Sequence, residues 1–301
     1  MNTLTHQIQE LKKIKNAIIL VHNYQPPEIQ ELADFLGDSL GLSIEAARTD
    51  ANMIIFCGVR FMAETAKILS PEKTVLIPDN NAGCPMADTI TSNDVKKLRS
   101  EHPEAQVLAY VNTSAEVKAE CDMCCTSANA VKVVTEGLPD AKEIIFIPDK
   151  NLAKYVSRIT GRHFILWDGS CPIHDQILAK HIHFQRLLHP NALIIVHPEC
   201  TPEVIDLADQ VLSTEGMSRF VSHSSEKEFI VGTEVGMLER LQRENPEKNF
   251  YPASAEAICP DMKKITPEKI LHSLQFGIGE ITMPESIRRR AERSIRRMLK
   301  Y

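Results

Sequence analysis

Three Cys-Pro dipeptides divide this chain into nearly equal lengths. They are Cys84-Pro85, Cys171-Pro172 and Cys259-Pro260, so that the cysteines lie 87 residues (84 to 171) and 88 residues (171 to 259) apart. A pattern that repeats at a long, fixed period indicates copies of one structural unit. We therefore expect three related units, each of which brings one cysteine to a shared centre.

Four landmarks recur in the same order in each predicted unit. An apolar run that ends at a polar residue is followed by a hydroxyl residue, then by a second β-branched run, and then by the cysteine. The first runs are 17–21, 107–111 and 193–196, and the second runs are 53–57, 143–147 and 228–232. The hydroxyl residues are Ser39, Ser127 and Thr214. Because the landmarks keep their order and similar spacing, we interpret the repeat as structural.

The repeat predicts an α/β fold class. Strands that alternate with helices of about ten residues indicate parallel sheets covered by helices on both faces. We expect three three-layer αβα domains, related by a pseudo-threefold axis around a central site. Their predicted bounds are 1–100, 101–186 and 187–264, and the C-terminal helices at 265–301 are expected to pack back on the first domain.

Composition excludes several classes of protein. A formal net charge of −6 and a pI near 6.0 argue against a nucleic-acid binder. The chain has no run of 18 apolar residues and no apolar signal core near its start, so we expect neither a membrane span nor export. Eight cysteines in a chain of this kind indicate metal binding or catalysis more than disulfides. The sequence therefore predicts a cytoplasmic protein that uses some of its cysteines chemically.

The cysteines of the Cys-Pro pairs are the candidate metal ligands. Cys84, Cys171 and Cys259 each close one repeat, and Cys-Pro is also the last element of an iron–sulfur ligand run. Three soft thiolates favour an iron–sulfur cluster over a hard cation. A cubane held at three of its four corners leaves one iron free to act as a Lewis acid.

The other five cysteines have competing interpretations. Cys57 and Cys200 lie in or near apolar runs, and buried cysteines are usually inert packing residues. Cys121 and Cys124 form a C-x-x-C pair next to Cys125, which could also hold a metal. No second close pair completes a four-cysteine zinc site.

Pairs of polar residues follow the first strand of each unit. They are His22 with Tyr24, Tyr110 with Asn112, and His197 with Glu199. Side chains two residues apart on a strand project the same way, and ligands of open parallel sheets bind beyond the carboxyl ends of the strands. These groups are suited to acid–base catalysis, although a histidine at such a position is often only structural.

The three hydroxyl residues have two interpretations. Ser39, Ser127 and Thr214 stand where helices are expected to begin. Serine and threonine are favoured N-caps, which would make these residues structural. Helix N-termini also bind carboxylates and phosphates, so capping and anion binding can coexist there.

At these positions the chain resembles the quinolinate synthases, iron–sulfur enzymes of NAD biosynthesis. The similarity covers essentially the whole chain. The matching motifs are His22-Asn23-Tyr24-Gln25, Gly37-Asp38-Ser39, Tyr110-Val111-Asn112-Thr113, Cys124-Cys125-Thr126-Ser127-Ala128-Asn129, His197-Pro198-Glu199-Cys200 and Ser213-Thr214-Glu215-Gly216-Met217.

The resemblance implies a fold, a cofactor and a reaction. The family has three αβα domains around one [4Fe–4S] cluster, and the implied ligands here are Cys84, Cys171 and Cys259. The implied reaction condenses iminosuccinate with dihydroxyacetone phosphate to quinolinate, with loss of phosphate and water. An aspartate-oxidising enzyme is the expected supplier of iminosuccinate.

The resemblance also implies the site residues. Substrate contacts are implied for His22, Ser39, Tyr110, Val111, Asn112, Ser127, His197, Pro198, Glu199 and Thr214, and catalytic roles for His22, Tyr24, Tyr110, His197 and Glu199. Some members extend the last cysteine into a C-x-x-C-x-x-C run linked to redox control. Here Pro260-Asp261-Met262 follows Cys259, so that thiol switch is absent.

Three other functions remain open from sequence. The chain could be a different open-cubane hydro-lyase that acts on a small di- or tricarboxylate. It could be an iron–sulfur sensor without enzymatic activity, although the acidic chain shows no convincing partner-binding element. A structural zinc protein is the third alternative.

Overall fold

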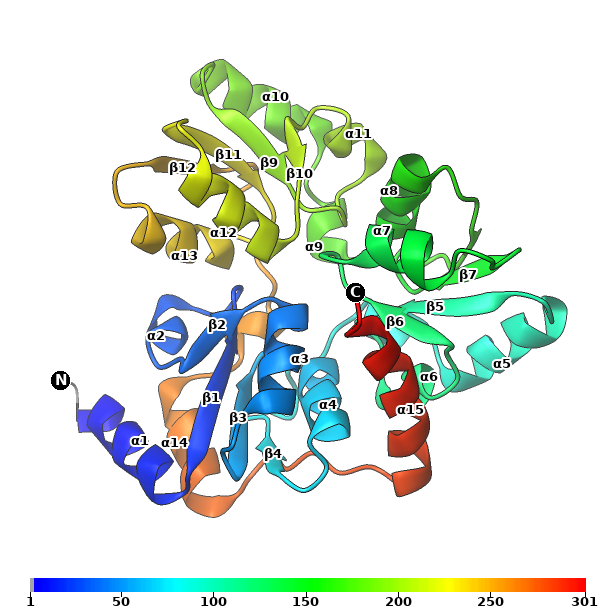
Figure 1. Cartoon of the computed structure of the whole chain (residues 1–301). Coiled ribbons are helices and arrows are strands. Elements are labelled where there is room, and N and C mark those ends of the chain that lie inside the picture. The colour runs from blue at the N-terminus through cyan, green and yellow to red at the C-terminus, as the bar shows by residue number, and fades with distance from the viewer. Residues whose placement is uncertain (1–2) are drawn as a thin grey trace.

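The computed structural model describes residues 3–301, and its strands form three four-stranded sheets. Their strand orders are β2-β1-β3-β4, β6-β5-β7-β8 and β10-β9-β11-β12, which is one topology repeated. Strands are parallel throughout these sheets. Figure 1 shows the three units arranged around a common centre. The predicted α/β fold with three related parallel-sheet units is confirmed.

Helices and strands alternate through each unit. The first contains β1 (Ala17–His22), α2 (Pro27–Gln30), β2 (Phe35–Gly37), α3 (Ser39–Arg48), β3 (Met53–Cys57), α4 (Arg60–Leu69), β4 (Thr74–Leu76) and the turn η1 (Ala87–Thr89). The second contains α5 (Ser92–Glu101), β5 (Gln106–Tyr110), α6 (Ala115–Lys118), β6 (Met123–Cys125), α7 (Ala130–Lys132), η2 (Val133–Gly137), β7 (Ile144–Ile147), α8 (Lys150–Thr160), β8 (Ile165–Leu166) and α9 (Pro172–Asp175). The third contains α10 (Ala179–Leu188), β9 (Leu193–Val196), α11 (Pro202–Ile205), β10 (Gln210–Val211), α12 (Thr214–His223), β11 (Glu228–Gly232), α13 (Gly236–Glu244), β12 (Asn249–Pro252) and η3 (Asp261–Lys263).

The two central strands of each sheet are the apolar runs of the sequence. In β3, β5 and β11 every residue after the first is buried, and all of β7 is buried. Such continuous apolar strands are expected where helices cover both faces of a parallel sheet. In the first unit, α3 packs on α4 and on β1 and β2, while α1 (Thr3–Ile14) packs on α14 (Pro267–Phe276) and on β1.

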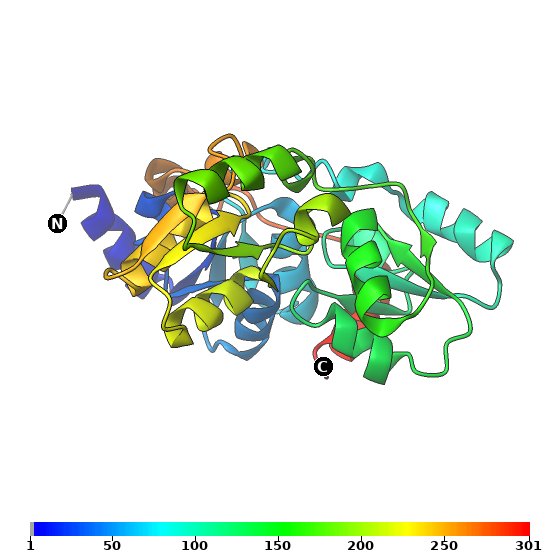
Figure 2. The same cartoon turned by 90° about the horizontal axis from the view of Figure 1, so that it is seen from above.

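The C-terminal helices pack on two different units. Helix α14 packs against α1 and β3 of the first unit, as expected. Helix α15 (Glu285–Met298) instead lies mainly against α6 and β6 of the second unit, and touches α4 of the first; Figures 1 and 2 show it beside the second unit. Its Ala291, Ser294 and Met298 are buried there. The domain bounds at 100 and 186 stay a prediction. No described helix is long and apolar enough to cross a membrane.

Candidate active site and metal centre

A cavity of about 410 Å³ lies where the three units meet, and residues of all three line it. Many of these residues follow the carboxyl ends of strands, where open parallel sheets bind ligands. The predicted residues among them are His22, Tyr24, Ser39, Cys84, Tyr110, Asn112, Ser127, Cys171, His197, Glu199, Thr214 and Cys259. The structure therefore brings together twelve of the predicted site residues.

The pairing register shows that the strand-end residues are equivalent in the three units. The last paired residues of the central strands are Val21 with Cys57, Ala109 with Ile147, and Val196 with Gly232. The next residue on the first strand is His22, Tyr110 or His197, and two residues later come Tyr24, Asn112 and Glu199. Each repeat thus contributes two polar side chains to the cavity from the same place in its sheet.

Two predicted substrate contacts, Val111 and Pro198, do not line the cavity. Each lies between two residues that face it, and alternate residues at a strand end point in opposite directions. The backbone N–H of Val111 donates to the carbonyl of Cys125 at 2.9 Å, which joins the ends of β5 and β6. Substrate contacts of Val111 and Pro198 stay a prediction.

Ser39 and Thr214 are the first residues of α3 and α12, but they do not cap these helices. The side chain of Asp38 accepts the capping hydrogen bond of α3, and the side chain of Ser213 accepts that of α12. The capping interpretation of Ser39 and Thr214 is therefore wrong, because the preceding residue already does this. Both residues line the cavity.

Ser127 also does not cap a helix. It lies in a turn before α7, and Asn129 occupies the cap position. Its Oγ lies 3.2 Å from Nε2 of His197, so the second and third units meet through these two side chains. A similar link joins the first and third units, where Nδ2 of Asn23 donates to Oγ1 of Thr214 at 2.8 Å.

Each of the three Cys-Pro pairs opens a short helical turn at the cavity wall. Cys84 precedes η1, Cys171 occupies the cap position of α9, and Cys259 precedes η3. Backbone N–H groups two or three residues further on donate to the sulfurs; they belong to Met86 and Ala87, to His174, and to Asp261 and Met262. Proline suits the start of such a turn because its φ is already helical and it lacks an N–H that would be unpaired there. The turn therefore explains why proline follows each cysteine.

The three thiols of Cys84, Cys171 and Cys259 are expected to lose their protons when a metal binds. Burial raises the pKa of Cys84 to about 12, and it raises the pKa values of Cys171 and Cys259 above the ordinary value. Metals bind the thiolate, so metal binding must release the proton and supply the compensating charge. Soft sulfur donors suit iron or zinc better than magnesium or calcium. These residues can hold a metal cofactor.

The three sulfurs as a set lie too far apart to share one ion. Among the described His, Cys, Asp and Glu residues, the group whose ligand atoms all lie within 4.8 Å of one another is Cys171, His174 and Glu199, and neither Cys84 nor Cys259 belongs to it. Three thiolates on one tetrahedral zinc would lie roughly 3.8 Å apart, since the Zn–S bond is about 2.3 Å. As arranged here, the three sulfurs are therefore not all placed to share one zinc ion.

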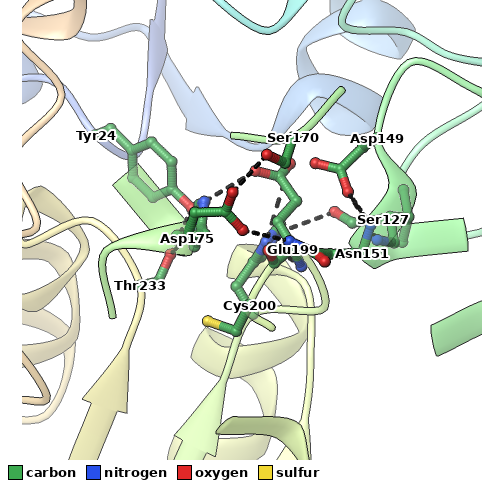
Figure 3. A network of polar contacts seen from close by, with 12 residues as sticks. Tyr24, Ser127, Asp149, Asn151, Ser170, Asp175, Glu199, Cys200 and Thr233 are labelled. Atoms are coloured by element: carbon green, nitrogen blue, oxygen red, sulfur yellow. Dashed lines mark hydrogen bonds and ion pairs between the residues drawn. The ribbon is translucent and has the colours of Figure 1, made fainter. Parts of the chain in front are cut away.

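A chain of polar contacts connects the two tyrosines of the cavity. The hydroxyl of Tyr24 lies 2.6 Å from Oγ1 of Thr233, which lies 2.9 Å from Nε2 of His174. Nδ1 of His174 lies 2.9 Å from Oε2 of Glu199, and the Tyr110 hydroxyl donates to Oε1 of the same carboxylate. Tyr24, Thr233 and Glu199 can be followed in Figure 3. These contacts join residues of all three units, and the approach of His174 Nδ1 to Glu199 is a short distance without the alignment of a hydrogen bond.

A second group of contacts, also drawn in Figure 3, fixes the backbone of Glu199. Nδ2 of Asn151 donates to the Glu199 carbonyl at 3.2 Å and to Oδ1 of Asp175 at 2.7 Å. The hydroxyl of Ser170 donates to the other carboxylate oxygen of Asp175. Asp149 caps α8 by accepting the N–H of Asn151 at 2.8 Å. Glu199 is therefore tied to α9, the turn that begins at Cys171.

His22 and His197 are neutral hydrogen-bond donors at neutral pH. Nδ1 of His22 accepts the N–H of Tyr24 at 3.2 Å, and Nδ1 of His197 accepts the N–H of Glu199 at 3.4 Å. A ring nitrogen that accepts carries no proton, so these bonds assign the proton to Nε2 in both rings. Burial lowers the pKa of each histidine to about 3.

Glu199 is the base that the cavity offers. Burial opposes its ionisation, but the close contacts with His174, His197 and Tyr110 outweigh burial and lower its pKa to about 2. Burial and the charge of Glu199 raise the pKa values of Tyr24 and Tyr110 well above the ordinary value. One carboxylate is thus surrounded by neutral proton donors, an arrangement suited to general acid–base chemistry.

Acid is expected to destabilise the cofactor-free protein through His22 and His197. Their pKa is about 3 when folded and 6.5 ordinarily, so the unfolded chain binds more protons between these values. The contribution of these histidines to the free energy of unfolding should be complete above pH 6.5. It should fall as the pH drops toward 3, by about 1.4 kcal/mol per pH unit for each histidine. In urea unfolding between pH 5 and 8, His197→Asn should show a shallower dependence on pH.

The control for this pH dependence is His183→Asn, on the exposed side of α10. His183 lies outside the cavity, so this variant should keep the wild-type dependence. If His197→Asn kept it as well, the buried neutral state of His197 would be refuted.

The remaining cysteines lie away from the cavity. Cys57 and Cys200 are fully buried in the cores, as expected for packing residues. Cys124 and Cys125 lie on β6, where they are fully buried beside α15, and Sγ of Cys124 contacts Ser294 at 3.5 Å. Neither these four nor Cys121 lines the cavity.

Four polar residues of the site did not emerge from the sequence. His174 follows Cys171 by three residues, a spacing that returns a side chain to the same side of a helical turn. Asp38 stands directly before a helix and could have been identified as its cap. Thr233 and Glu234 follow β11, but polar residues at that point are equally compatible with a solvent-exposed loop.

Comparisons with known proteins match nearly the whole chain to a single family. Residues 6–300 match the family described as quinolinate synthetase A protein. The quinolinate synthase of Thermodesulfovibrio yellowstonii is 52% identical over 300 residues, covering 99% of this chain and 98% of that protein. Quinolinate synthase 1 of Methanosarcina acetivorans is 51% identical over 296 residues, covering 98% and 97%. The quinolinate synthase of Desulforudis audaxviator is 52% identical over the same length and coverage.

Proposed function

This chain belongs to the quinolinate synthetase A family, and we propose that its central cavity makes quinolinate from iminosuccinate and dihydroxyacetone phosphate. The reaction would join the two carbon skeletons and release phosphate and water, as a transferase-type condensing enzyme does. The observation that carries the proposal is that three Cys-Pro turns and six strand-end polar side chains line one cavity. Relatives of about half identity over nearly the full length bear the name of this activity, which supports it.

We propose that Cys84, Cys171 and Cys259 hold a [4Fe–4S] cluster. Three cysteines that line one cavity, and whose sulfurs do not all lie within 4.8 Å of one another, support a cluster over a single zinc. When bound, a cluster with one iron free of protein ligands would supply a Lewis acid that polarises a substrate oxygen. The remaining chemistry falls to the side chains of the cavity.

The proposed substrates carry two carboxylates and one phosphate, which the cavity must bind without cationic side chains. Among the described residues that line it there is no lysine or arginine. Ser39 and Thr214 offer hydroxyls at the N-termini of α3 and α12, where N–H groups also favour anions. His22 and His197 can each donate from Nε2. We propose that these four residues orient the anionic groups, and that neutral donors let phosphate leave without a strong ion pair to break.

Proton transfers are proposed to centre on Glu199. As a carboxylate it can accept a proton from substrate carbon or nitrogen, and the Tyr110 hydroxyl that donates to it can supply one. On its other side, His174 and Thr233 connect it to Tyr24. A proton taken up at one end could therefore be replaced from the other while the cavity stays closed to water.

The setting of the enzyme follows from its substrate. Iminosuccinate is an imine that water hydrolyses, so an aspartate-oxidising enzyme is proposed to supply it directly. All eight cysteines are unpaired, which supports a reducing compartment such as the cytoplasm.

The test is to purify the protein without oxygen and to measure iron, sulfide and product formation together. We expect iron and sulfide in nearly equal amounts, and quinolinate by mass spectrometry from the two proposed substrates with no added electron donor or acceptor. Hydration or dehydration of a small dicarboxylate without quinolinate would favour the hydro-lyase alternative. Colourless protein that contains zinc would overturn the cofactor proposal.

A further inference from the structure

A buried carboxylate borders the cavity next to Cys259 without facing the substrate chemistry. Glu234 lies two residues beyond β11 and is 0% exposed. Its Oε1 accepts the backbone N–H of Cys259 at 3.1 Å, and its Oε2 accepts that of Gly236 at 2.8 Å. Both oxygens are occupied, and one bond fixes the backbone of a proposed cluster ligand.

Lys263 extends this contact to a second residue of the site. Its Nζ lies 2.9 Å from Oε1 of Glu234 and donates to the backbone carbonyl of Tyr24. Lys263 belongs to η3, the turn that begins after Cys259-Pro260. The Glu234–Lys263 ion pair therefore joins the Cys259 turn of the third unit to the backbone of Tyr24 in the first.

The second unit has an acid at the equivalent position. The last paired residues Ile147 of β7 and Gly232 of β11 are equivalent, so Asp149 corresponds to Glu234. Asp149 is 0% exposed, and its Oδ1 accepts the backbone N–H groups of Asn151 and Leu152 at 2.8 Å. Figure 3 shows it beside the network that carries Glu199. The equivalent acid of the second unit therefore caps α8, whereas Glu234 holds the backbone of Cys259.

The first unit fixes its cysteine differently. Val59 occupies the equivalent position after β3 and has no polar side chain. Instead, Oδ1 of Asp261, in the turn of the third unit, accepts the N–H of Gly83 at 3.2 Å, directly before Cys84. A carboxylate therefore anchors the backbone at the Cys84 and Cys259 turns, and Glu234 also connects to a tyrosine of the site through Lys263.

We propose that Glu234 and Lys263 are positioning residues that hold the Cys259 sulfur and Tyr24 in a fixed relation. The roles of Cys259 and Tyr24 rest on the proposed function. Neither positioning side chain needs to touch the reacting atoms. Removal of a residue that orients a metal ligand typically lowers metal affinity or activity by roughly 10- to 100-fold.

The test compares Glu234→Gln with Glu239→Gln, the same change at an exposed position of α13. A glutamine has one donor end, so it cannot accept from Cys259 and Gly236 on both sides. Anaerobically reconstituted Glu234→Gln should release iron to a chelator at least roughly 10-fold faster and show altered EPR parameters of the reduced cluster. Turnover should fall by roughly 10- to 100-fold with KM within about threefold. Glu239→Gln should match the wild type.

Lys263 provides a second pair of variants, because its side chain is 26% exposed and its loss should leave the fold intact. Lys263→Met should also lower turnover, while Lys263→Arg should restore it by donating to both Glu234 and Tyr24. Wild-type iron release, EPR and turnover in Glu234→Gln would overturn the proposal; if that variant does not fold, wild-type behaviour of Lys263→Met would do so. Iron release and EPR do not depend on the substrate, so a failure of quinolinate formation in the wild type would count only against the proposed function.

Discussion

Replacing Cys84, Cys171 or Cys259 by alanine is expected to remove the iron and the activity together. Each thiol lines the central cavity and each accepts N–H bonds from its own turn, so no other described cysteine can take its place. Loss of a Lewis acid worth several kcal/mol predicts a fall in turnover of roughly 10³-fold or more. Iron and sulfide analysis of protein reconstituted without oxygen, with quinolinate formation measured on the same samples, checks this.

Cys57→Ala and Cys124→Ala are the matched controls. Both cysteines are fully buried, and neither lines the cavity. Removing one buried sulfur should cost about 1–3 kcal/mol of stability and leave iron content unchanged. Loss of iron from Cys124→Ala, with retention in Cys84→Ala, would instead identify the C-x-x-C segment as the metal site.

The features that are best predicted from the sequence are those that recur in all three repeats. The regular spacing of three cysteines predicts that they lie at equivalent positions of the three units. The polar pairs at 22–24, 110–112 and 197–199 were predicted because each follows the end of an apolar strand. Continuous apolar runs identified the central strands, because strands buried on both faces have no polar side.

The edge strands of the sheets and the contacts between units could not be predicted in this way. Strands β2, β6 and β10 contain three residues or fewer, too short for a recognisable alternation. Helices were predicted at 265–301, but the sequence pattern of a helix gives its apolar face and not the partner that the face meets. His174 and Glu234 acquire their roles from partners in other units or far along the chain, and such contacts depend on packing that a single sequence does not encode locally.

Glu199→Gln is expected to lower turnover by roughly 10²–10⁴ while the fold and the iron content are kept. Glu199 contacts His174 on one oxygen and Tyr110 on the other, and glutamine preserves the size of the side chain but cannot take up a proton. The Glu199 carboxylate also lies within 4.8 Å of the Cys171 sulfur and a His174 nitrogen, so iron content must be measured alongside turnover. Single-turnover formation of quinolinate, far-UV circular dichroism and iron analysis on one preparation separate chemistry from folding and loading.

Glu203→Gln is the control for this variant, since Glu203 lies on α11 shortly after Glu199 and is exposed. Its turnover should equal that of the wild type. Near-normal turnover in Glu199→Gln would remove this carboxylate from the mechanism, because a group that holds its neighbours only through hydrogen bonds can be replaced by an amide at modest cost. A loss of iron in Glu199→Gln would mean instead that the carboxylate supports the metal centre, through the contact network that ties its backbone to the turn after Cys171.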